Sequence, residues 1–447
     1  MASTPLAEAP SPVLASAARK VMARLLPVLV IAFIINYIDR VNVGFVASHL
    51  KTDLGIGAAA YGLGAGLFFV GYAVFEVPSN MLLHKFGAKV WITRIMITWG
   101  IVAAAMALTT NEAVFYILRF LLGVAEAGFF PGCVLYIATW LPAAYRGKAM
   151  AILLTGSAVA SIIAGPITGG LLMISGGGLH GWQWMFIIEG LAAVVLSAVT
   201  WFALVNSPEK AKWLSDPERA ALRTELDAEQ TDREDAQGGK VSVWKLLADT
   251  QILLFCFIYF AIQLVIYAAT FWLPTIIKQM GKMDDFQVGL WNTIPWVIAI
   301  IAMYVFAGLA SKRPVYQRWV AFALVLASIG MFVSTIGGPV IMYIGICIAA
   351  LGFKSASSLF WPIPQSYFDV RIAAAGIALI NSIGNLGGFV APSVFGYLQQ
   401  TTGSVVGGLY GLAVSSIVAA GVVLALRMKT RKAPVGAPVA IDPVSSR

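Results

Sequence analysis

Long apolar runs recur twelve times along the 447-residue chain. The hydrocarbon core of a membrane is about 30 Å thick and is crossed by about 20 helical residues. Helices are the only open-ended structures that cross it, because a backbone group without a hydrogen-bond partner is too costly in lipid. We therefore predict an all-α membrane protein whose twelve spans lie near 22–47, 60–83, 90–109, 113–140, 147–174, 183–205, 250–278, 286–310, 317–336, 339–363, 371–398 and 404–428.

The composition excludes several other classes of protein. Hydrophobic residues make up 59% of the chain and charged residues 11%, whereas soluble proteins carry about 25% charged residues. The cysteines, Cys133, Cys256 and Cys347, all lie inside apolar runs, and no histidines have metal-ligand spacing. We expect no disulfide framework, no metal and no cofactor other than a coupling proton.

The basic residues predict the orientation in the membrane. With both termini in the cytoplasm, 24 of the 30 Lys and Arg residues fall on the cytoplasmic side. Only Lys51, Lys278 and Lys282 fall outside. This bias follows the positive-inside rule, so the net charge of +9 requires no nucleic-acid partner. We expect a bacterial inner (plasma) membrane protein that works as a monomer within the bilayer.

One long hydrophilic stretch divides the spans into two sets of six. Ser215-Asp216-Pro217-Glu218 has the pattern of a helix N-terminus, so we predict a short surface helix to about Glu229 within a solvated linker. The expected organisation is a cytoplasmic tail (1–21), a six-helix bundle (22–205), a cytoplasmic linker (206–249), a second six-helix bundle (250–428) and a cytoplasmic tail (429–447).

The two halves repeat one pattern. Arg146 precedes the fifth span and Pro166 follows about 20 residues later, as Arg371 and Pro392 do around the eleventh. Small residues crowd both spans, which lets helices approach closely. A duplication of six spans with a linker is the outline of a transporter whose halves rock about a central site.

Six charged residues lie at membrane depth, where each would cost about 2.5–3.5 kcal/mol at a helix centre. Three-helix repeats would make the first, fourth, seventh and tenth spans equivalent, and five of the six charges fall on the first, fourth and tenth. A shared polar cavity between the halves explains this clustering. The six residues are Asp39, Arg40, Glu76, Arg119, Glu126 and Lys354.

Arg119 and Glu126 lie two helical turns apart, so both face one side of the fourth span. Arginine keeps its charge and needs an anionic neighbour, which is Glu126, Asp39 or a substrate carboxylate. A carboxyl group that exchanges its proton would supply proton coupling, whereas a static ion pair would only fix helix packing.

Adjacent helical residues point about 100° apart, so Asp39 and Arg40 face different neighbours, or mark the outer end of the span. Tyr72 and Glu76 share a helix face. Tyr72 is a candidate ligand donor, and we expect Glu76 to pair with basic residues of the adjacent loop.

The C-terminal half contributes further candidates for the cavity wall. Gln263, Tyr267 and Phe271 recur at intervals of four on the seventh span, either as packing or as an amphipathic wall. Lys354 lies on the tenth span, and Asn385 is a polar residue on the eleventh.

These motifs resemble the anion:cation symporter family of the major facilitator superfamily, which includes tartrate, phthalate, hexuronate and galactonate permeases. The resemblance covers about Leu25 to Leu426. It is most specific in Asn36-Tyr37-Ile38-Asp39-Arg40, Gly71-Tyr72 to Pro78-Ser79-Asn80, Arg119-Phe120-Leu121-Leu122-Gly123 to Pro131-Gly132, and Trp182 to Glu189-Gly190.

The resemblance implies roles for the candidate residues. Arg40 and Tyr72 would bind the substrate carboxylate, and Tyr37 and Asn385 would line the site. Asp39 and Glu126 would be the protonatable pair, with Arg119 as a coupling residue. The loops His84-Lys85-Phe86-Gly87-Ala88-Lys89 and Ser311-Lys312-Arg313-Pro314 depart from the family's gating motifs, and Lys354 is unusual for the family.

The sequence therefore predicts a secondary active transporter that imports a small organic carboxylate by proton symport. The substrate would be a sugar acid, a tartrate-like dicarboxylate or an aromatic acid, bound among Tyr37, Arg40, Tyr72, Tyr267, Lys354 and Asn385. An exchanger or exporter of similar anions is the alternative within transport. An enzyme or receptor is less favoured, because the spans contain no nucleophile elbow and no phosphate-binding loop.

Overall fold

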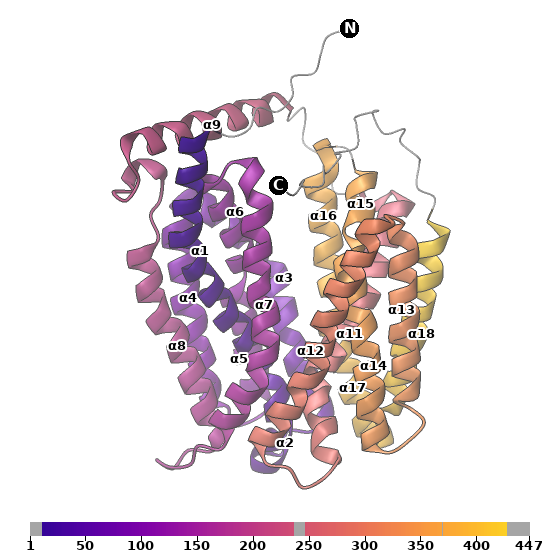
Figure 1. Ribbon diagram of the computed structural model, residues 1–447. Helices are drawn as coiled ribbons and strands as arrows, with labels where there is room; N and C mark the ends of the chain where they lie inside the picture. The colour runs from indigo at the N-terminus through magenta and orange to yellow at the C-terminus, as the bar shows by residue number, and fades with distance from the viewer. Residues whose placement is uncertain (1–10, 237–245, 369, 427–447) are drawn as a thin grey trace, which may run out of the picture.

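The computed structural model describes residues 11–236, 246–368 and 370–426. Within them, twelve spans are long and apolar enough to cross a membrane, which confirms the predicted all-α membrane fold. The helices before the linker form one group and those after it a second group (Figure 1). The first group contains α1 (Pro12–Val41), α2 (Val43–Leu54), α3 (Ala58–Phe86), α4 (Ala88–Ala105), α5 (Glu112–Glu126), α6 (Phe129–Trp140), α7 (Ala143–Leu172) and α8 (Gly181–Ala203).

The second group follows the linker helix α9 (Asp216–Ala236). It contains α11 (Thr250–Gln279), α12 (Asp285–Lys312), α13 (Tyr316–Val333), α14 (Pro339–Phe360), α15 (Pro362–Tyr367), α16 (Val370–Asn385), α17 (Gly387–Thr402) and α18 (Val406–Ala425). We call the end of the molecule that carries α9 the linker face, and the opposite end, which carries α2, the latch face. The domain bounds 22–205 and 250–428 and the cytoplasmic termini stay predictions. The tail 429–447 lies outside the described residues.

Four spans are interrupted near their polar residues. The first breaks at Asn42, the fourth at Ala127-Gly128, the tenth at Trp361 and the eleventh at Leu386. Gly128 has a φ of 89°, a left-handed conformation that glycine adopts without steric cost. The break at Asn42 directly follows Asp39 and Arg40, and α5 ends at Glu126. Interrupted helices at mid-membrane are typical of transporter binding sites.

Proline residues inside the helices leave carbonyl groups that other helices satisfy. A proline has no N–H, so the carbonyl four residues before it loses its intrahelical donor. Pro295 frees the carbonyl of Trp291, which accepts a 2.8 Å hydrogen bond from Tyr343 Oη. The carbonyl of Ala127 lacks an intrahelical donor because it lies in the break before α6, and it accepts a 2.6 Å hydrogen bond from Ser79 Oγ. These bonds tie α3 to the α5–α6 break and α14 to α12.

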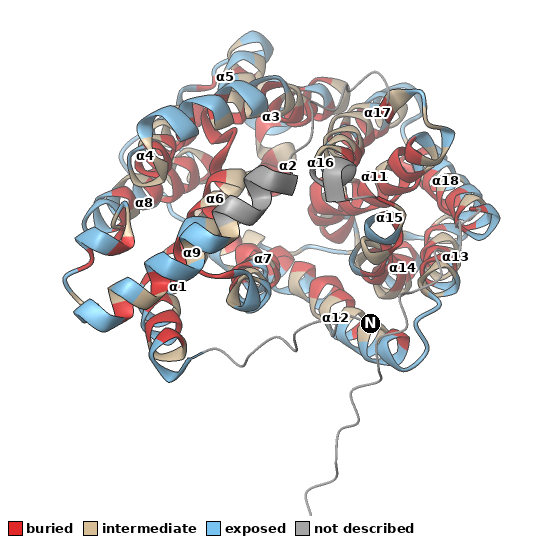
Figure 2. Ribbon diagram, turned by 90° about the horizontal axis from the view of Figure 1, so that it is seen from above, coloured by how far each residue is buried: buried red, intermediate tan, exposed pale blue. Residues whose placement is uncertain are grey.

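The linker helix is fastened to the N-terminal group. Glu218 accepts a 2.9 Å hydrogen bond from Ser16 and forms an ion pair of 2.8 Å with Lys20, and both partners lie on α1. At the other end, Arg146 of α7 pairs with Glu229 at 2.6 Å. Figure 2 shows α9 lying across the end of this group. The predicted helix start is confirmed, but the helix continues to Ala236, and it docks by one face where we expected a solvated linker.

The Lys20 ammonium and the Ser215 N–H lower the pKa of Glu218 to about 2. A carboxyl group with a lowered pKa stabilises the folded state above its ordinary pKa, and the stabilisation is lost as the pH falls through the folded value. The contact between α9 and α1 therefore stays charged throughout the neutral range.

The two groups meet close to the latch face, where small residues let their helices cross. Gly165 of α7 lies against the backbone of Gly289 of α12, and a Cβ at either position would overlap the other's carbonyl. Gly62 of α3 packs in the same way against the carbonyl of Pro392 on α17. The groups diverge toward the linker face (Figure 1). This structure is therefore closed on the latch face.

Candidate functional site

A buried ion pair joins two of the interrupted spans. Arg40 of α1 pairs with Glu126 of α5 at 3.0 Å, and Asn36 donates a 2.9 Å hydrogen bond to the same Oε2 atom of Glu126. Glu126 has no exposed surface, whereas the Arg40 side chain is 17% exposed. Arg40 Nε and Glu126 Oε1 are buried without a hydrogen-bond partner among the described residues. The pair is thus held by one oxygen of the carboxylate and retains unused bonding capacity.

Aromatic rings surround the Arg40 guanidinium. Its central carbon lies 5.2 Å from the ring centre of Phe68 and 5.1 Å from that of Tyr72, both on α3. Guanidinium groups are attracted to the faces of aromatic rings at such distances. Tyr72 thus lies beside Arg40, and a shared role of the two in binding a ligand stays a prediction.

Arg119 forms no ion pair with Glu126, one of the three anionic partners that the sequence leaves open. Among the described residues no carboxylate lies within ion-pair distance of Arg119. Its guanidinium donates a 3.4 Å hydrogen bond to the carbonyl of Ala65 and lies 5.1 Å from the Phe68 ring centre. Two turns of helix place Arg119 too far along the axis, so Arg40 on the neighbouring span takes Glu126 instead. Nε and one terminal nitrogen of Arg119 are buried without a partner in the described chain.

Asp39 points away from Arg40, as the 100° rotation between neighbours predicts. It has no exposed surface and accepts a 3.2 Å hydrogen bond from Asn42 Nδ2. The same nitrogen lies 2.7 Å from Glu189 Oε2, and Glu189 Oε1 accepts a 2.9 Å hydrogen bond from Thr168. Asp39 and Glu189 are therefore linked through one amide.

Glu189 is missing from the set of charged residues predicted at membrane depth. It lies within the predicted span 183–205 and is 6% exposed on α8, so the same criterion identifies it. Its hydrogen-bond partners are Thr168 on α7 and Asn42 at the break after α1. The sequence alone does not show that these residues are neighbours of Glu189. Glu76 also differs from expectation: it forms no ion pair with the described residues.

The C-terminal group presents Tyr267 to the N-terminal group. The rings of Tyr267 and Phe69 lie 4.5 Å apart edge to face, and Tyr267 stacks on Phe271 at 6.1 Å. The stripe on the seventh span therefore faces the other half. Asn385 accepts a 3.1 Å hydrogen bond from Gln263, so these two predicted polar residues bind each other.

A small void lies between the two groups of helices. Tyr37 lines it from α1, Ser161 from α7, and Thr270, Asn292 and Trp296 from the C-terminal group. Its volume of about 10 Å³ leaves room for about one water molecule, so a substrate site at Tyr37 stays a prediction.

Asn292 was not predicted as a site residue, although it is polar and lies inside a span. The half-buried Lys354 has no hydrogen-bond or ion-pair partner in the described part of the chain, and it does not contact Arg40.

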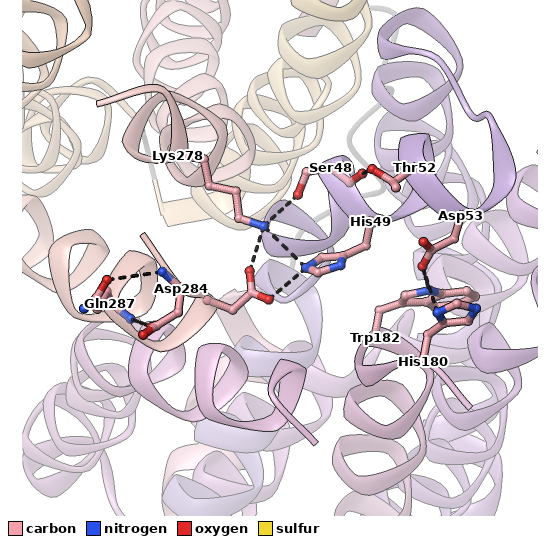
Figure 3. Close-up of polar contacts among 10 residues, drawn as sticks. Ser48, His49, Thr52, Asp53, His180, Trp182, Lys278, Asp284 and Gln287 are labelled. Atoms are coloured by element: carbon pink, nitrogen blue, oxygen red, sulfur yellow. Dashed lines mark hydrogen bonds and ion pairs between the residues drawn. The ribbon is translucent and has the colours of Figure 1, made fainter. Parts of the chain in front are cut away.

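A cluster of ion pairs closes the latch face across the two groups (Figure 3). Asp285, at the start of α12, pairs with His49 of α2 at 3.0 Å and with Lys278 of α11 at 2.7 Å. Lys278 also donates a 2.8 Å hydrogen bond to Ser48. We call His49, Lys278 and Asp285 the latch. Nearby Asp53 binds Trp182 and His180, contacts confined to the N-terminal group.

The comparisons with known proteins agree with this architecture. The sequence profile of the Major Facilitator Superfamily matches residues 29–392. The chain belongs to the major facilitator superfamily. It is therefore a multi-pass membrane transporter and not an enzyme.

Two of its relatives are bacterial. A quinolone resistance transporter of Acinetobacter baumannii is 43% identical over 89% of this chain and 91% of its own. A protein of Agrobacterium vitis named as a tartrate transporter is 43% identical over 93% and 95%. The inward open structure of the xylose transporter XylE of Escherichia coli has a TM-score of 0.72 over 92% of this chain and 98% of its own, at 15% identity. That likeness concerns the fold alone.

Proposed function

We propose that this transporter imports a small organic carboxylate together with protons by alternating access. The observation that carries the proposal is the ion pair between Arg40 and Glu126. Arg40 keeps its positive charge and needs an anion beside it. Either Glu126 or a substrate carboxylate supplies that anion. A proton on Glu126 would release Arg40 for the substrate, so substrate and proton would be bound together.

The surroundings of Arg40 suit an organic acid. Phe68 and Tyr72 flank its guanidinium, and Tyr267 of the C-terminal group packs against Phe69 on the same helix as these two rings. A carboxylate on Arg40 would contact both halves and favour the state in which they close around it. A ligand shifts such an equilibrium only through differential affinity. The relative named as a tartrate transporter supports a carboxylate substrate.

Exchange or export of similar anions is the second candidate. The relative named as a quinolone resistance transporter favours this candidate, because a transporter that confers resistance would carry its substrate out of the cell. Right-side-out and inverted vesicles distinguish the directions. We also propose a plasma-membrane location in a bacterium, a functional monomer and no cofactor besides the coupling proton.

The test uses purified protein in two stages. Thermal shifts against a panel of tartrate, sugar acids and aromatic acids identify the ligand, because binding stabilises the folded state by mass action. Proteoliposomes with an imposed pH gradient then measure uptake of that labelled acid. Accumulation that collapses with a protonophore is expected. Uptake at the same rate with and without the pH gradient, and with and without the protonophore, would contradict proton symport.

A further inference from the structure

Glu189 is a buried carboxyl group for which the proposed cycle has no role. It projects from α8 among Thr168, Asn42 and Asp39, and all four side chains are at most 6% exposed. Both oxygens of Glu189 accept hydrogen bonds, from Asn42 at 2.7 Å and from Thr168 at 2.9 Å. Such a completely bonded buried carboxyl requires a specific protonation state, because burial of an unpaired charge is costly.

Asn42 joins Glu189 to Asp39 by a single nitrogen. Its Nδ2 lies 3.2 Å from Asp39 Oδ1 and 2.7 Å from Glu189 Oε2. One amide group can serve both acids, but it carries no charge and cannot neutralise either. Among the described residues no Lys, Arg or His lies within ion-pair distance of Asp39 or Glu189. Two carboxylates that share a site without a cation cannot both stay ionised.

Other charged groups act on the pair from α5. Glu126 adds negative charge near Asp39, and Arg119 opposes it from the same helix. Arg40 is already paired with Glu126. From α7, Glu189 receives only the hydroxyl of Thr168. Arg119 bonds to the Ala65 carbonyl and Arg40 to Glu126, so neither arginine contacts the two acids directly.

We propose that Asp39 and Glu189 hold one proton between them across Asn42, with Glu189 as a positioning residue that sets how tightly Asp39 binds that proton. The inference rests on the proposed proton symport and adds a residue to it. Asn42 lies at the break between α1 and α2. A change of angle at this break alters the bridge, and so changes the proton affinity of Asp39 as the halves move.

Infrared spectroscopy of the substrate-free protein tests the shared proton directly. The wild type is expected to show the C=O stretch of a protonated carboxyl at neutral pH. Glu189→Gln and Asp39→Asn should each abolish it, because the remaining acid then ionises alone. Two independent acids behave differently, since the band of one survives loss of the other. A band that persists in Asp39→Asn, or no band in the wild type, would overturn the proposal.

Transport supplies the second readout. Glu189→Gln preserves shape and should move the midpoint of the pH profile of uptake by about one unit or more to lower pH, the size of coupling expected for such a pair. Glu112→Gln, an exposed acid in the first turn of α5, is the matched control and should leave the midpoint unchanged. A midpoint equal to wild type in folded Glu189→Gln would reject the positioning role.

Failure of the proposed function looks different. Wild-type uptake without proton dependence would remove symport, while the infrared result would still report whether the two acids share a proton. If Glu189→Gln does not fold, Asn42→Ala replaces it: the amide donates to the ionised form of each acid, so its loss should let the carboxyl band persist to higher pH. An Asn42→Ala protein whose band has the wild-type pH dependence would count against the proposal.

Discussion

Thr293 Oγ1 on α12 donates a 2.9 Å hydrogen bond to the carbonyl of Ile162 on α7. Pro166 leaves this carbonyl without its intrahelical donor. A side chain of the C-terminal half therefore supplies the hydrogen bond that is missing within α7. The bond is available only while the two helices cross at the latch face. It therefore favours the conformation described over one in which Thr293 Oγ1 has only the Gly289 carbonyl of its own helix, 3.3 Å away.

Thr293→Val should weaken that conformation while leaving the fold intact. A lost hydrogen bond is worth about 0.5–1.5 kcal/mol, so the equilibrium between latch-closed and latch-open states should shift by about two- to tenfold. Spin-label distances across the latch face measure the shift. Thr155→Val is the control, since Thr155 bonds only within α7, to Ala151. Equal distance distributions in wild type and Thr293→Val would refute the role.

Asp285→Asn should open the latch, because His49 and Lys278 lose their shared anion. Of the two ion pairs of Asp285, the one with His49 joins the halves, and a partly exposed pair contributes about 0.2–1 kcal/mol, so we expect about a 1.4- to fivefold shift toward the latch-open state. An impermeant thiol reagent on Thr275→Cys, in the hollow beside Lys278, reports the opening. Asp53→Asn lies on the same face but contacts only its own half, so it should label like the parent. Identical labelling of all three proteins would reject the latch.

Much of the fold is predictable from the sequence, because each segment that crosses the lipid must be a helix of about 20 mostly apolar residues. Helix lengths and their apolar content are local, and the twelve spans agree closely with those found, such as 250–278 against Thr250–Gln279. The first span differs most: α1 begins at Pro12, where Ser11 accepts a hydrogen bond from Leu14, and runs beyond the membrane to dock on α9. Hydropathy marks only the part of a helix that lies in lipid.

The candidate site is predictable in its residues but not in its pairs. Membrane depth identifies Asp39, Arg40, Arg119 and Glu126 without any structure. Which acid meets which base depends on how α1 and α5 cross, so the sequence left Arg119 with three possible partners. The link from Asp39 to Glu189 through Asn42 depends on the helix break at Asn42, and no local sequence pattern predicts that break.

Arg40→Ala should weaken substrate binding by about ten- to a hundredfold, the worth of one charge-assisted hydrogen bond of about 1.5–3 kcal/mol. Arg40→Lys should recover little, because an ammonium cannot make the two parallel bonds of a guanidinium. Calorimetric titration of the folded variants with the identified acid gives both affinities. Wild-type affinity in folded Arg40→Ala would assign Arg40 to structure alone.

Glu126→Gln should abolish concentrative, proton-driven uptake and leave exchange of substrate intact. The amide has nearly the same shape as the carboxyl group, but it neither takes up nor releases a proton. Arg40 then has no acid beside it and should bind the substrate carboxylate more readily. Counterflow and pH-driven uptake in proteoliposomes separate the two activities. The exposed Glu225→Gln on α9 serves as control, and concentrative uptake by Glu126→Gln at several pH values would contradict the coupling role.

Lys354→Gln should reduce binding of a dicarboxylate much more than binding of a matched monocarboxylate. Lys354 is half-buried on α14, and in the described chain it has neither a hydrogen bond nor an ion pair. An ammonium in such a place needs an anion or must reach water along its stem. A dianion held by Arg40 at one end and Lys354 at the other would supply that anion and bridge the two halves.

The expected loss for the dicarboxylate is about ten- to a hundredfold, again the worth of one charge-assisted bond, with less than a threefold change for the monocarboxylate. Lys312→Gln, at the exposed end of α12, removes the same charge away from the cavity and should change neither affinity. Equal losses for both acids would mean that Lys354 acts through the general field or the fold. No loss for either would place its ammonium in water, outside the site.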